Sequence, residues 1–449
     1  MKINLSEIYR VFNTGFEGRD VSVPDICTDT RTLKKGDVFF ALIGDTDGHR
    51  YAAQAFYNGA SAIIVEKYAE GVETAKQIKV KDTTRALLTL AAYYYKKFGK
   101  LKCAAVTGSN GKTTTKELLA AMLSEKYETL KSEKSFNNAI GLPRTVFKLK
   151  DKFDAAVFEI GMNHAGEIKN LVSAISPRVS IITNVGRAHI AFFRDGLKGI
   201  AKAKAEIMTG MEPGGVVVIN ADDDFAGFME REAAKRKLNT VTFGIKNKAD
   251  VRAVDIVTAA DGTYFKVNCL KERFFTGLKG GYNIYNAAAA VAAAMAFKVP
   301  GKSIKNALAG FKMEGFMRFE KVRLKNSVLL INDCYNANPD SFSASIEALK
   351  KEGYKSVVAV MGDMLELGKS SAAMHIEIGK KFREIPLKNF FVYGKYSGQV
   401  KKGYGEKARV YTDREKLSRV LKQAVEKGDT VFVKGSRGNK LEEIVEVLK

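Results

Sequence analysis

Residues 101–124 read LKCAAVTGSNGKTTTKELLAAMLS, and this stretch decides the fold of the central part of the chain. The apolar run at 101–106 predicts a buried strand, and the amphipathic segment from about 112 to 124 predicts a helix. Between them lies a short turn with two glycines. A strand, a glycine turn and a helix in this order make one β-loop-α unit, which is the building block of a parallel sheet.

The turn of this unit has the chemistry of a phosphate-binding loop. Its glycines let backbone N–H groups converge on phosphate oxygens, Lys112 neutralises their charge, and the Thr113 hydroxyl can bind Mg²⁺ at the helix N-terminus. The loop departs from the usual spacing, because Val106 stands where a further glycine is standard. A glycine-rich turn with a chance lysine is the alternative, but the strand and helix around it favour a nucleoside triphosphate site. The predicted nucleotide-binding residues of this loop are Gly108, Ser109, Asn110, Gly111, Lys112, Thr113 and Thr114.

Hydrophobic patterns on either side of this unit predict an α/β protein with three domains. Apolar strands are expected at 155–160 and 179–183, and each ends in Gly, Asn or His, as in parallel sheets that bind ligands at their carboxyl ends. A fresh alternation of strands and helices begins after about residue 312. We therefore predict a small mixed α/β domain at 1–82, a central parallel-sheet domain like those of P-loop ATPases at 83–312, and a Rossmann-like α/β domain at 313–449.

Composition indicates an ordinary globular protein and excludes several classes. Of 449 residues, 46% are hydrophobic and 27% charged, which argues against disorder and low-complexity repeats. The longest apolar run, at 287–297, is too short to span a membrane, and the polar start lacks a secretory signal, so a cytoplasmic location is expected. The four cysteines are scattered, which favours reduced thiols over a disulfide framework or a zinc site.

The net charge of +23 is unevenly distributed. Lys and Arg number 11 against 12 Asp and Glu in residues 1–82, 36 against 20 in 83–312, and 26 against 18 in 313–449. A basic middle fits a nucleotide, but it fits RNA as well. Because there is no arginine-rich tract, we expect small anionic substrates and no nucleic-acid partner. A nucleotide-dependent RNA-binding protein is the competing class.

Three polar residues that follow predicted strands or turns are further candidates. Glu159 ends an apolar strand, where a second Mg²⁺ ligand is needed, although a simple turn carboxylate is the alternative. Asn138, in an Asn-Asn pair, either contacts phosphate or substrate or belongs to a plain turn. His189 follows the strand at 179–183 and is either a ligand or an ordinary core histidine.

Lys204 stands out by its position on a predicted helix. At 100° per residue, Ile200, Ala203, Ile207 and Met208 form one apolar arc, and Lys204 falls inside it. A lysine turned toward the core is costly unless paired, and burial lowers its pKa so that the neutral amine can react. The alternative is that its chain passes along the apolar neighbours to reach solvent.

Taken in order, these motifs resemble the Mur ligase family. The resemblance rests on the loop at 108–113, Glu159, the segment 137–143 and His189, and extends to the segments TDTR at 28–31 and DGH at 47–49. In the third domain, DCYNANP at 333–339, GDMLELG at 362–368 and VKGSR at 433–437 are similar to the branch that adds D-alanyl-D-alanine. The chain departs from the family at Tyr282, usually His, and at Ile190-Ala191, where the family often has a segment with Glu.

The resemblance implies an ATP-dependent amide ligase of peptidoglycan precursor synthesis. Such an enzyme joins D-alanyl-D-alanine to the terminal carboxylate of UDP-N-acetylmuramoyl-tripeptide through an acyl phosphate, uses two Mg²⁺ ions, carries a carbamylated Lys204, and is expected to be a monomer. The alternatives are a sister ligase or a folyl-polyglutamate-type ligase that adds a single amino acid. The implied catalytic residues are Lys112, Glu159, His189 and Lys204. The implied metal ligands are Thr113, Glu159, His189 and Lys204, the further ATP contacts are Asn283, Asn286, Arg318 and Asp333, and the substrate contacts are Thr30, Arg31, Asn138, Tyr335, Asn336 and Asn338.

Overall fold

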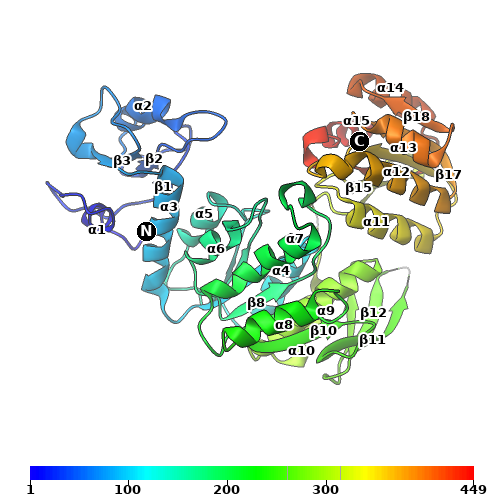
Figure 1. The fold of residues 1–449 in the computed structure, drawn as a ribbon, viewed down its shortest axis with the longest axis horizontal. Helices are drawn as coiled ribbons and strands as arrows, with labels where there is room; N and C mark the ends of the chain where they lie inside the picture. Colours follow the sequence, from blue (N-terminus) through cyan, green and yellow to red (C-terminus); the bar gives the residue numbers. More distant parts are fainter. Residues whose placement is uncertain (260, 314) are drawn as a thin grey trace.

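The computed structural model describes residues 1–259, 261–313 and 315–449, and their strands form three separate sheets that succeed one another along the chain. In Figure 1 the unit coloured green lies between a blue N-terminal and an orange C-terminal unit. The predicted α/β class with three units is confirmed. The proposed boundaries at 82/83 and 312/313 fall between sheets, because the sheets span residues 26–79, 102–276 and 320–434.

The N-terminal unit is built on a small parallel sheet of short strands. Its strands are β1 (Ile26–Cys27), β2 (Val38–Phe40), β3 (Ala62–Val65) and β4 (Gln77–Lys79), and its helices are α1 (Leu5–Val11) and α2 (Ala52–Tyr57). Helix α3 (Thr83–Tyr95) follows, and the Asp82 side chain caps it by accepting a hydrogen bond from the Arg85 N–H at 2.8 Å. α3 contacts α1 of the N-terminal unit and α5 (Gly141–Val146) of the central unit, so it links the two units.

The central unit contains a nine-stranded sheet in the order β13-β12-β11-β10-β9-β8-β5-β7-β6. The strands are β5 (Lys102–Thr107), β6 (Thr129–Lys131), β7 (Ala155–Glu159), β8 (Val179–Ile182), β9 (Val216–Asn220), β10 (Asn239–Gly244), β11 (Val251–Thr258), β12 (Thr263–Val267) and β13 (Arg273–Thr276), and the helices are α4 (Lys112–Ser124), α5 (Gly141–Val146), α6 (Glu167–Val172), α7 (Leu197–Ala205), α8 (Ala226–Lys235), α9 (Gly281–Ala296) and α10 (Gly301–Gly310). β5 lies between β7 and β8 and pairs in parallel with both. The β-loop-α unit predicted from residues 101–124 is therefore confirmed, and its strand lies inside the parallel part of the sheet.

Two features of the central unit go beyond the sequence prediction. β12 pairs antiparallel with β11 and with β13, so this edge of the sheet is an antiparallel extension of the parallel core. The alanine-rich stretch at 287–297 belongs mostly to α9, which packs on α4 with its alanines from Ala287 to Ala294 buried. Small side chains allow these two helices to approach closely, which brings the start of α9 beside the glycine loop.

The C-terminal unit has a six-stranded sheet in the order β14-β15-β19-β16-β17-β18, parallel except for β14. The strands are β14 (Glu320–Arg323), β15 (Leu329–Asp333), β16 (Val357–Gly362), β17 (Leu387–Tyr393), β18 (Ala408–Tyr411) and β19 (Thr430–Lys434), and the helices are α11 (Pro339–Glu352), α12 (Ser371–Lys381), α13 (Ser397–Tyr404), α14 (Arg414–Ala424) and α15 (Glu442–Leu448). The alternation predicted after residue 312 is confirmed.

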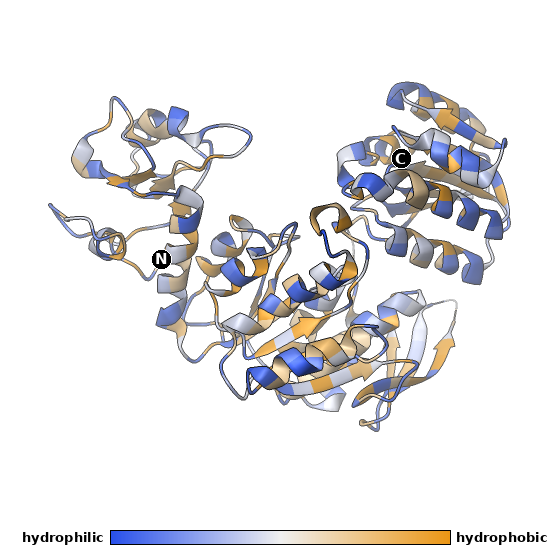
Figure 2. Cartoon of the chain, in the orientation of Figure 1, coloured by the Kyte–Doolittle hydropathy of each residue, from blue (hydrophilic) through white to orange (hydrophobic). Residues whose placement is uncertain are grey.

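Hydropathy follows this layered arrangement. Figure 2 shows apolar strands in the interior of the central and third units, flanked by helices with hydrophilic outer residues. The inner parallel strands of these sheets are buried on both faces, and β7 and β16 are buried along their whole length, whereas edge strands such as β14 are partly exposed. Among the described residues, no helix combines the length and apolar character needed to cross a membrane.

Candidate active site

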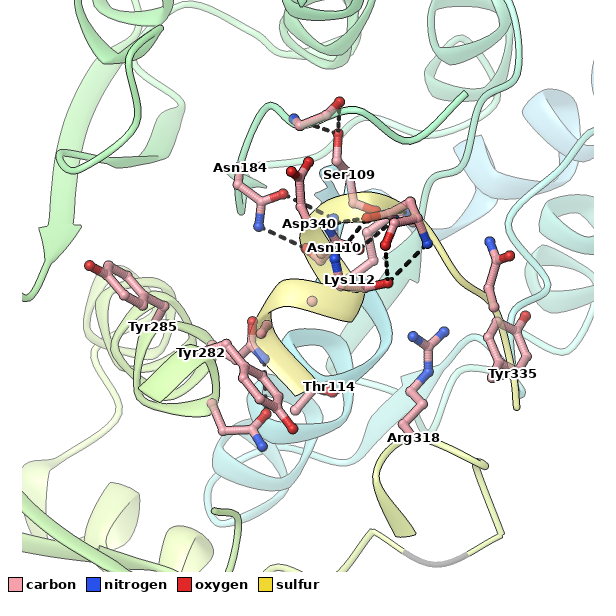
Figure 3. Close-up of a pocket in the computed structure, with 18 of the residues that line it drawn as sticks. Ser109, Asn110, Lys112, Thr114, Asn184, Tyr282, Tyr285, Arg318, Tyr335 and Asp340 are labelled. Atoms are coloured by element: carbon pink, nitrogen blue, oxygen red, sulfur yellow. Dashed lines mark hydrogen bonds between the residues drawn. The ribbon is translucent and has the colours of Figure 1, made fainter. Parts of the chain in front are cut away.

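A cavity of about 470 Å³ lies where the carboxyl ends of the central parallel strands face the third unit. Most residues predicted for the site line it, and Figure 3 shows several of them around the glycine loop. The predicted residues in its wall are Ser109, Asn110, Gly111, Lys112, Thr114, Glu159, His189, Asn283, Asn286, Arg318, Asp333, Tyr335, Asn336 and Asn338. The structure thus brings together residues that are more than 200 positions apart in the sequence.

The glycine loop is held against the segment after β8. The backbone N–H of Ser109 donates to the Asn184 carbonyl at 3.0 Å, and that of Asn110 donates to the Asn184 side-chain oxygen at 2.9 Å. Gly108 has φ +149, and a Cβ there would lie 1.8 Å from the Thr183 hydroxyl, so no larger residue fits. These contacts give the loop a fixed path before any ligand binds. Asn184 was missed by the sequence analysis because a lone amide after a strand carries no specific signal.

Gly111 performs a second, different role at the start of α4. Its φ of +83 is in the left-handed region, and a Cβ there would lie 2.2 Å from the Asn286 side-chain oxygen. Asn286 also donates to the Asn283 side-chain oxygen at 3.1 Å. Both predicted amides on α9 are therefore beside the loop, within reach of a nucleotide bound there.

Lys112 places its buried ammonium group on the glycine loop, where an anion could bind it. Its Nζ donates to the Gly108 carbonyl at 2.8 Å, folding the side chain back over the loop. Burial lowers the pKa of Lys112, the charge of Glu159 opposes this effect, and the charge of Arg318 adds to it. A bound phosphate would offset the repulsion between Lys112 and Arg318 and the burial of the lysine charge, because it supplies a negative charge beside them.

Glu159 ends β7 as a buried carboxylate, 1% exposed. One oxygen, Oε1, accepts a hydrogen bond from the Asn137 side chain at 2.8 Å, whereas the buried Oε2 has no hydrogen-bond partner among the described residues. The side chain of the adjacent Asn138 does not line the cavity. Its oxygen instead accepts a hydrogen bond from the Gly141 N–H at 2.8 Å. Asn137 therefore faces the site, whereas Asn138 shapes the turn before α5.

Lys204 is buried on α7, at 1% exposure, so the alternative in which its side chain reaches solvent is wrong. Burial lowers its pKa well below the ordinary value, the charge of Lys112 acts in the same direction, and the charge of Asp223 opposes both. Burial also raises the pKa of Asp223, whose carboxylate accepts from the Val185 N–H at 2.7 Å. Lys204 does not line the cavity, and the neutral amine that burial favours is the form of lysine that reacts with electrophiles.

His189 follows a short turn after β8 and has a left-handed backbone, with φ 60. Its Nδ1 lies 2.6 Å from Glu366 Oε2 of the third unit, a contact off the ideal hydrogen-bond direction. His189 holds the pKa of the Glu366 carboxyl below its usual range, chiefly through this contact. The pairing leaves Nε2 as the ring nitrogen available to a ligand, and Glu366 is a residue whose contact could not be foreseen from the sequence.

The third unit adds a cationic and aromatic wall. Arg318 donates to the Thr113 hydroxyl at 2.8 Å, and its guanidinium lies 4.1 Å from the centre of the Tyr335 ring. Figure 3 shows Arg318 and Tyr335 beside one another, on the side of the glycine loop away from Tyr285. Asp333 is buried and accepts from Lys434 at 2.6 Å, so its carboxylate is fixed at the cavity edge. Lys434 was quoted only as part of a motif and is a site residue that the sequence analysis did not single out.

Arg187 joins the central and third units and was also missed. Its Nε lies 2.8 Å from Asp340 Oδ1, its backbone N–H donates to Asp340 Oδ2 at 2.7 Å, and its other end contacts Glu377 at 2.9 Å. A further contact between the units is the Asn338 side chain, which donates to Asn110 at 2.9 Å. These bonds hold α11 over the phosphate loop.

Two predicted residues lie apart from the cavity, in the N-terminal unit. Arg31 is largely exposed and pairs with Asp29 at 2.6 Å, and this pairing lowers the pKa of Asp29 to about 2. Thr30 contacts Gln54 of α2 at 3.5 Å. Neither residue lines the cavity, so any role in binding requires a ligand long enough to reach another unit.

The donor set fits a magnesium site completed by phosphates. Among the described residues no group of three or more His, Cys, Asp and Glu could hold a metal by itself. Magnesium is usually held by one or two carboxylates together with substrate phosphates, and Glu159 offers a buried oxygen without a partner. The Thr113 hydroxyl is buried at the start of α4, the place where such loops hold the ion.

Family models match the two larger units. Residues 106–294 match the Mur ligase middle domain, and residues 317–437 match the family described as Mur ligase, glutamate ligase domain. The chain is 34% identical to the UDP-N-acetylmuramoyl-tripeptide--D-alanyl-D-alanine ligase of Bacillus subtilis (strain 168), over 99% of this chain and 97% of that protein.

Solved structures show the same relationship. The chain is similar to the crystal structure of MurF from Acinetobacter baumannii, with a TM-score of 0.90, 30% identity and coverage of 99% of this chain and 98% of that one. It is also similar to MurF ligase from Thermotoga maritima in complex with ADP, with a TM-score of 0.81, 29% identity and coverage of 94% and 96%. The similarity extends across all three units of the fold.

Proposed function

The chain belongs to the Mur ligase family, and from this premise we propose that it joins D-alanyl-D-alanine to UDP-N-acetylmuramoyl-tripeptide at the expense of ATP. The observation that carries this assignment is the 34% identity to a ligase of that name over 99% of the chain, third unit included. ATP phosphorylates the terminal carboxylate of the tripeptide to give an acyl phosphate and ADP. The amine of the dipeptide then attacks the acyl carbon, and phosphate leaves from a tetrahedral intermediate as the amide forms.

The cavity suits the first of these steps. Phosphoryl transfer needs positioning and neutralisation of charge more than covalent help from the protein. Lys112 would leave the Gly108 carbonyl, 2.8 Å away, to hold the phosphates of ATP. Arg318 would neutralise charge from the third unit, since its position beside Thr113 brings it over the same loop.

Two magnesium ions are part of the proposal. Thr113 and Glu159 would hold one, and His189 and a carbamylated Lys204 would hold the other. When bound, these ions neutralise phosphate charge and bring the carboxylate acceptor close to the γ-phosphate. Carbamylation forms a bond between the neutral Lys204 amine and CO₂ and releases one proton. The lowered pKa of the buried lysine favours this reaction, because it makes the neutral amine available. The product is an anionic oxygen ligand in place of a buried cation.

The remaining site residues would bind different parts of the substrates in different units. Asn283, Asn286 and Asp333 would contact the nucleoside of ATP, because they line the cavity beside the loop. Tyr335, Asn336 and Asn338 would form the dipeptide site on the third unit, and Asn138 would contact substrate after a change of side-chain direction. Thr30 and Arg31 would bind the uridine end, which lies far enough from the tripeptide carboxylate to reach the N-terminal unit. A cytoplasmic location and a monomeric state stay predictions.

Mass spectrometry of the products tests this assignment. With ATP, UDP-N-acetylmuramoyl-tripeptide and a panel of amines, we expect a product larger by one dehydrated D-alanyl-D-alanine, with ADP and phosphate in equal amounts. Addition of a single amino acid instead would favour a sister ligase. ATP turnover that rises with RNA, and RNA affinity that falls steeply with salt, would favour the competing RNA-binding class.

A further inference from the structure

Lys116 is a buried lysine on α4 that the proposed reaction does not use. It stands one helical turn after Lys112, and its side chain is completely buried. Its Nζ donates to the carbonyl oxygens of Ser132 and Lys134, both at 2.7 Å, and lies 2.8 Å from Glu117 Oε1. An ammonium has three donors, so these three partners satisfy it fully and fix its position.

The segment 132–137, two of whose carbonyls Lys116 binds, lies against the end of β7. The Ser132 hydroxyl accepts from the Glu159 N–H at 3.2 Å, and the Ser132 N–H donates to the Val157 carbonyl at 3.0 Å. A few residues later, the Asn137 side chain donates to Glu159 Oε1 at 2.8 Å, and its carbonyl accepts from the Gly161 N–H at 2.8 Å. The backbone and one carboxylate oxygen of Glu159 are therefore both set by residues 132–137.

This segment does not hold its path through regular secondary structure. β6 ends at Lys131, and Lys134 has φ 45, a left-handed conformation that is unfavourable for a residue with a side chain. The Lys116 ammonium binds the carbonyl of this same residue. The tertiary contact thus compensates for a backbone conformation that local preferences oppose.

We propose that Lys116 is a positioning residue for the metal site: by holding the carbonyls of Ser132 and Lys134, it keeps Asn137 against Glu159 and so directs the free oxygen of that carboxylate. This inference rests on the proposed role of Glu159 as a magnesium ligand. Lys116 thereby couples the helix that carries Lys112 and Thr113 to the strand that carries Glu159. Outer partners of this kind commonly change metal affinity without touching the ion.

The test measures Mn²⁺ binding to the full chain in the presence of ADP, by calorimetry, together with the affinity for UDP-N-acetylmuramoyl-tripeptide. In Lys116→Met we expect Mn²⁺ affinity to fall by about 10–100-fold, the usual cost of losing such a partner, with sugar-nucleotide affinity unchanged. Lys131→Met is the matched control, because Lys131 pairs with Glu117 from the half-exposed side and does not bind residues 132–134. It should bind Mn²⁺ as the unaltered protein does.

A double-mutant cycle separates positioning from general stabilisation. Lys116→Met combined with Asn137→Ala should lose no more Mn²⁺ affinity than the more affected single variant, because both act through the Glu159 carboxylate. Unchanged Mn²⁺ affinity in Lys116→Met, or additive losses in the double variant, would overturn the inference. Should Lys116→Met not fold, Lys116→Gln, whose side-chain amide keeps two N–H donors, is expected to show a smaller loss and is judged in the same way.

Glu159→Gln distinguishes this inference from the assignment on which it rests. If the unaltered protein binds Mn²⁺ no better than Glu159→Gln, the metal role of Glu159 and the positioning role of Lys116 both fail. If Glu159→Gln binds weakly and Lys116→Met binds normally, only the role of Lys116 fails.

Discussion

Replacing Lys204 by alanine is expected to abolish ligation. Loss of a direct metal ligand should lower kcat by more than about 100-fold, the upper end of what loss of an outer partner costs. Lys204 is 1% exposed, and the charge of Lys112 helps to lower its pKa, which supports the proposal that its carbamate serves the same site as Lys112. Formate, acetate or propionate should restore part of the activity in Lys204→Ala, because a small carboxylate can occupy the space that the side chain leaves.

The matched control for this variant lies on the same helix. Lys202 points away from the core, is 66% exposed in its side chain and pairs with Asp195 at 3.1 Å. Lys202→Ala should keep normal turnover and show no response to added carboxylates. Normal ligation by Lys204→Ala would contradict the proposed carbamate. If the variant is folded and inactive but added carboxylates restore no activity, the carbamate role is also contradicted.

Removal of the Lys112 side chain is the second change with a large expected effect. Lys112→Ala should lose ATP turnover by about 100-fold or more, the range measured when one preorganised charge-stabilising donor is removed. Binding of UDP-N-acetylmuramoyl-tripeptide should persist, because its uridine end is assigned to the N-terminal unit, away from the cavity that Lys112 lines. Titration calorimetry measures this affinity directly in the absence of ATP.

Lys126 supplies the comparison for Lys112. It follows the end of α4, is exposed and donates to the Lys298 carbonyl at 2.8 Å, so Lys126→Ala removes a positive charge without entering the cavity. Its ATP turnover should equal that of the unaltered protein. Loss of sugar-nucleotide binding in Lys112→Ala would contradict the proposed division of the substrates between the units.

Local patterns in the sequence predicted the parts of the site that are local. The glycine turn and its flanking strand and helix were predicted correctly, because glycine conformation and hydrophobic periodicity act over a few residues. The apolar arc of the helix places Lys204 on the core side, because that arc is set by the local sequence, and the structure decides between the two alternatives left open by showing that Lys204 is buried. The longest apolar run, at 287–297, is explained by packing, because it belongs mostly to α9 and its alanines pack on α4.

Contacts between distant residues could not be predicted in this way. Arg187 with Asp340 and His189 with Glu366 join the central and third units across more than 150 positions, and no local pattern selects one charged partner over another. The antiparallel strands β12 and β13 were not predicted, although their aromatic and β-branched residues are typical of strands, and their pairing with β11 depends on contacts beyond the local sequence. Asn137 and Asn138 are equivalent as neighbours in a turn, and only the fold decides that Asn137 faces Glu159.

In the proposed reaction, ATP converts the tripeptide carboxylate into an acyl phosphate before the dipeptide attacks. Substrate labelled with ¹⁸O in that carboxylate, turned over with ATP and D-alanyl-D-alanine, tests it directly by mass spectrometry of the released phosphate. Each released phosphate is expected to carry one oxygen from the labelled carboxylate. Release of phosphate without the label during amide formation would contradict it.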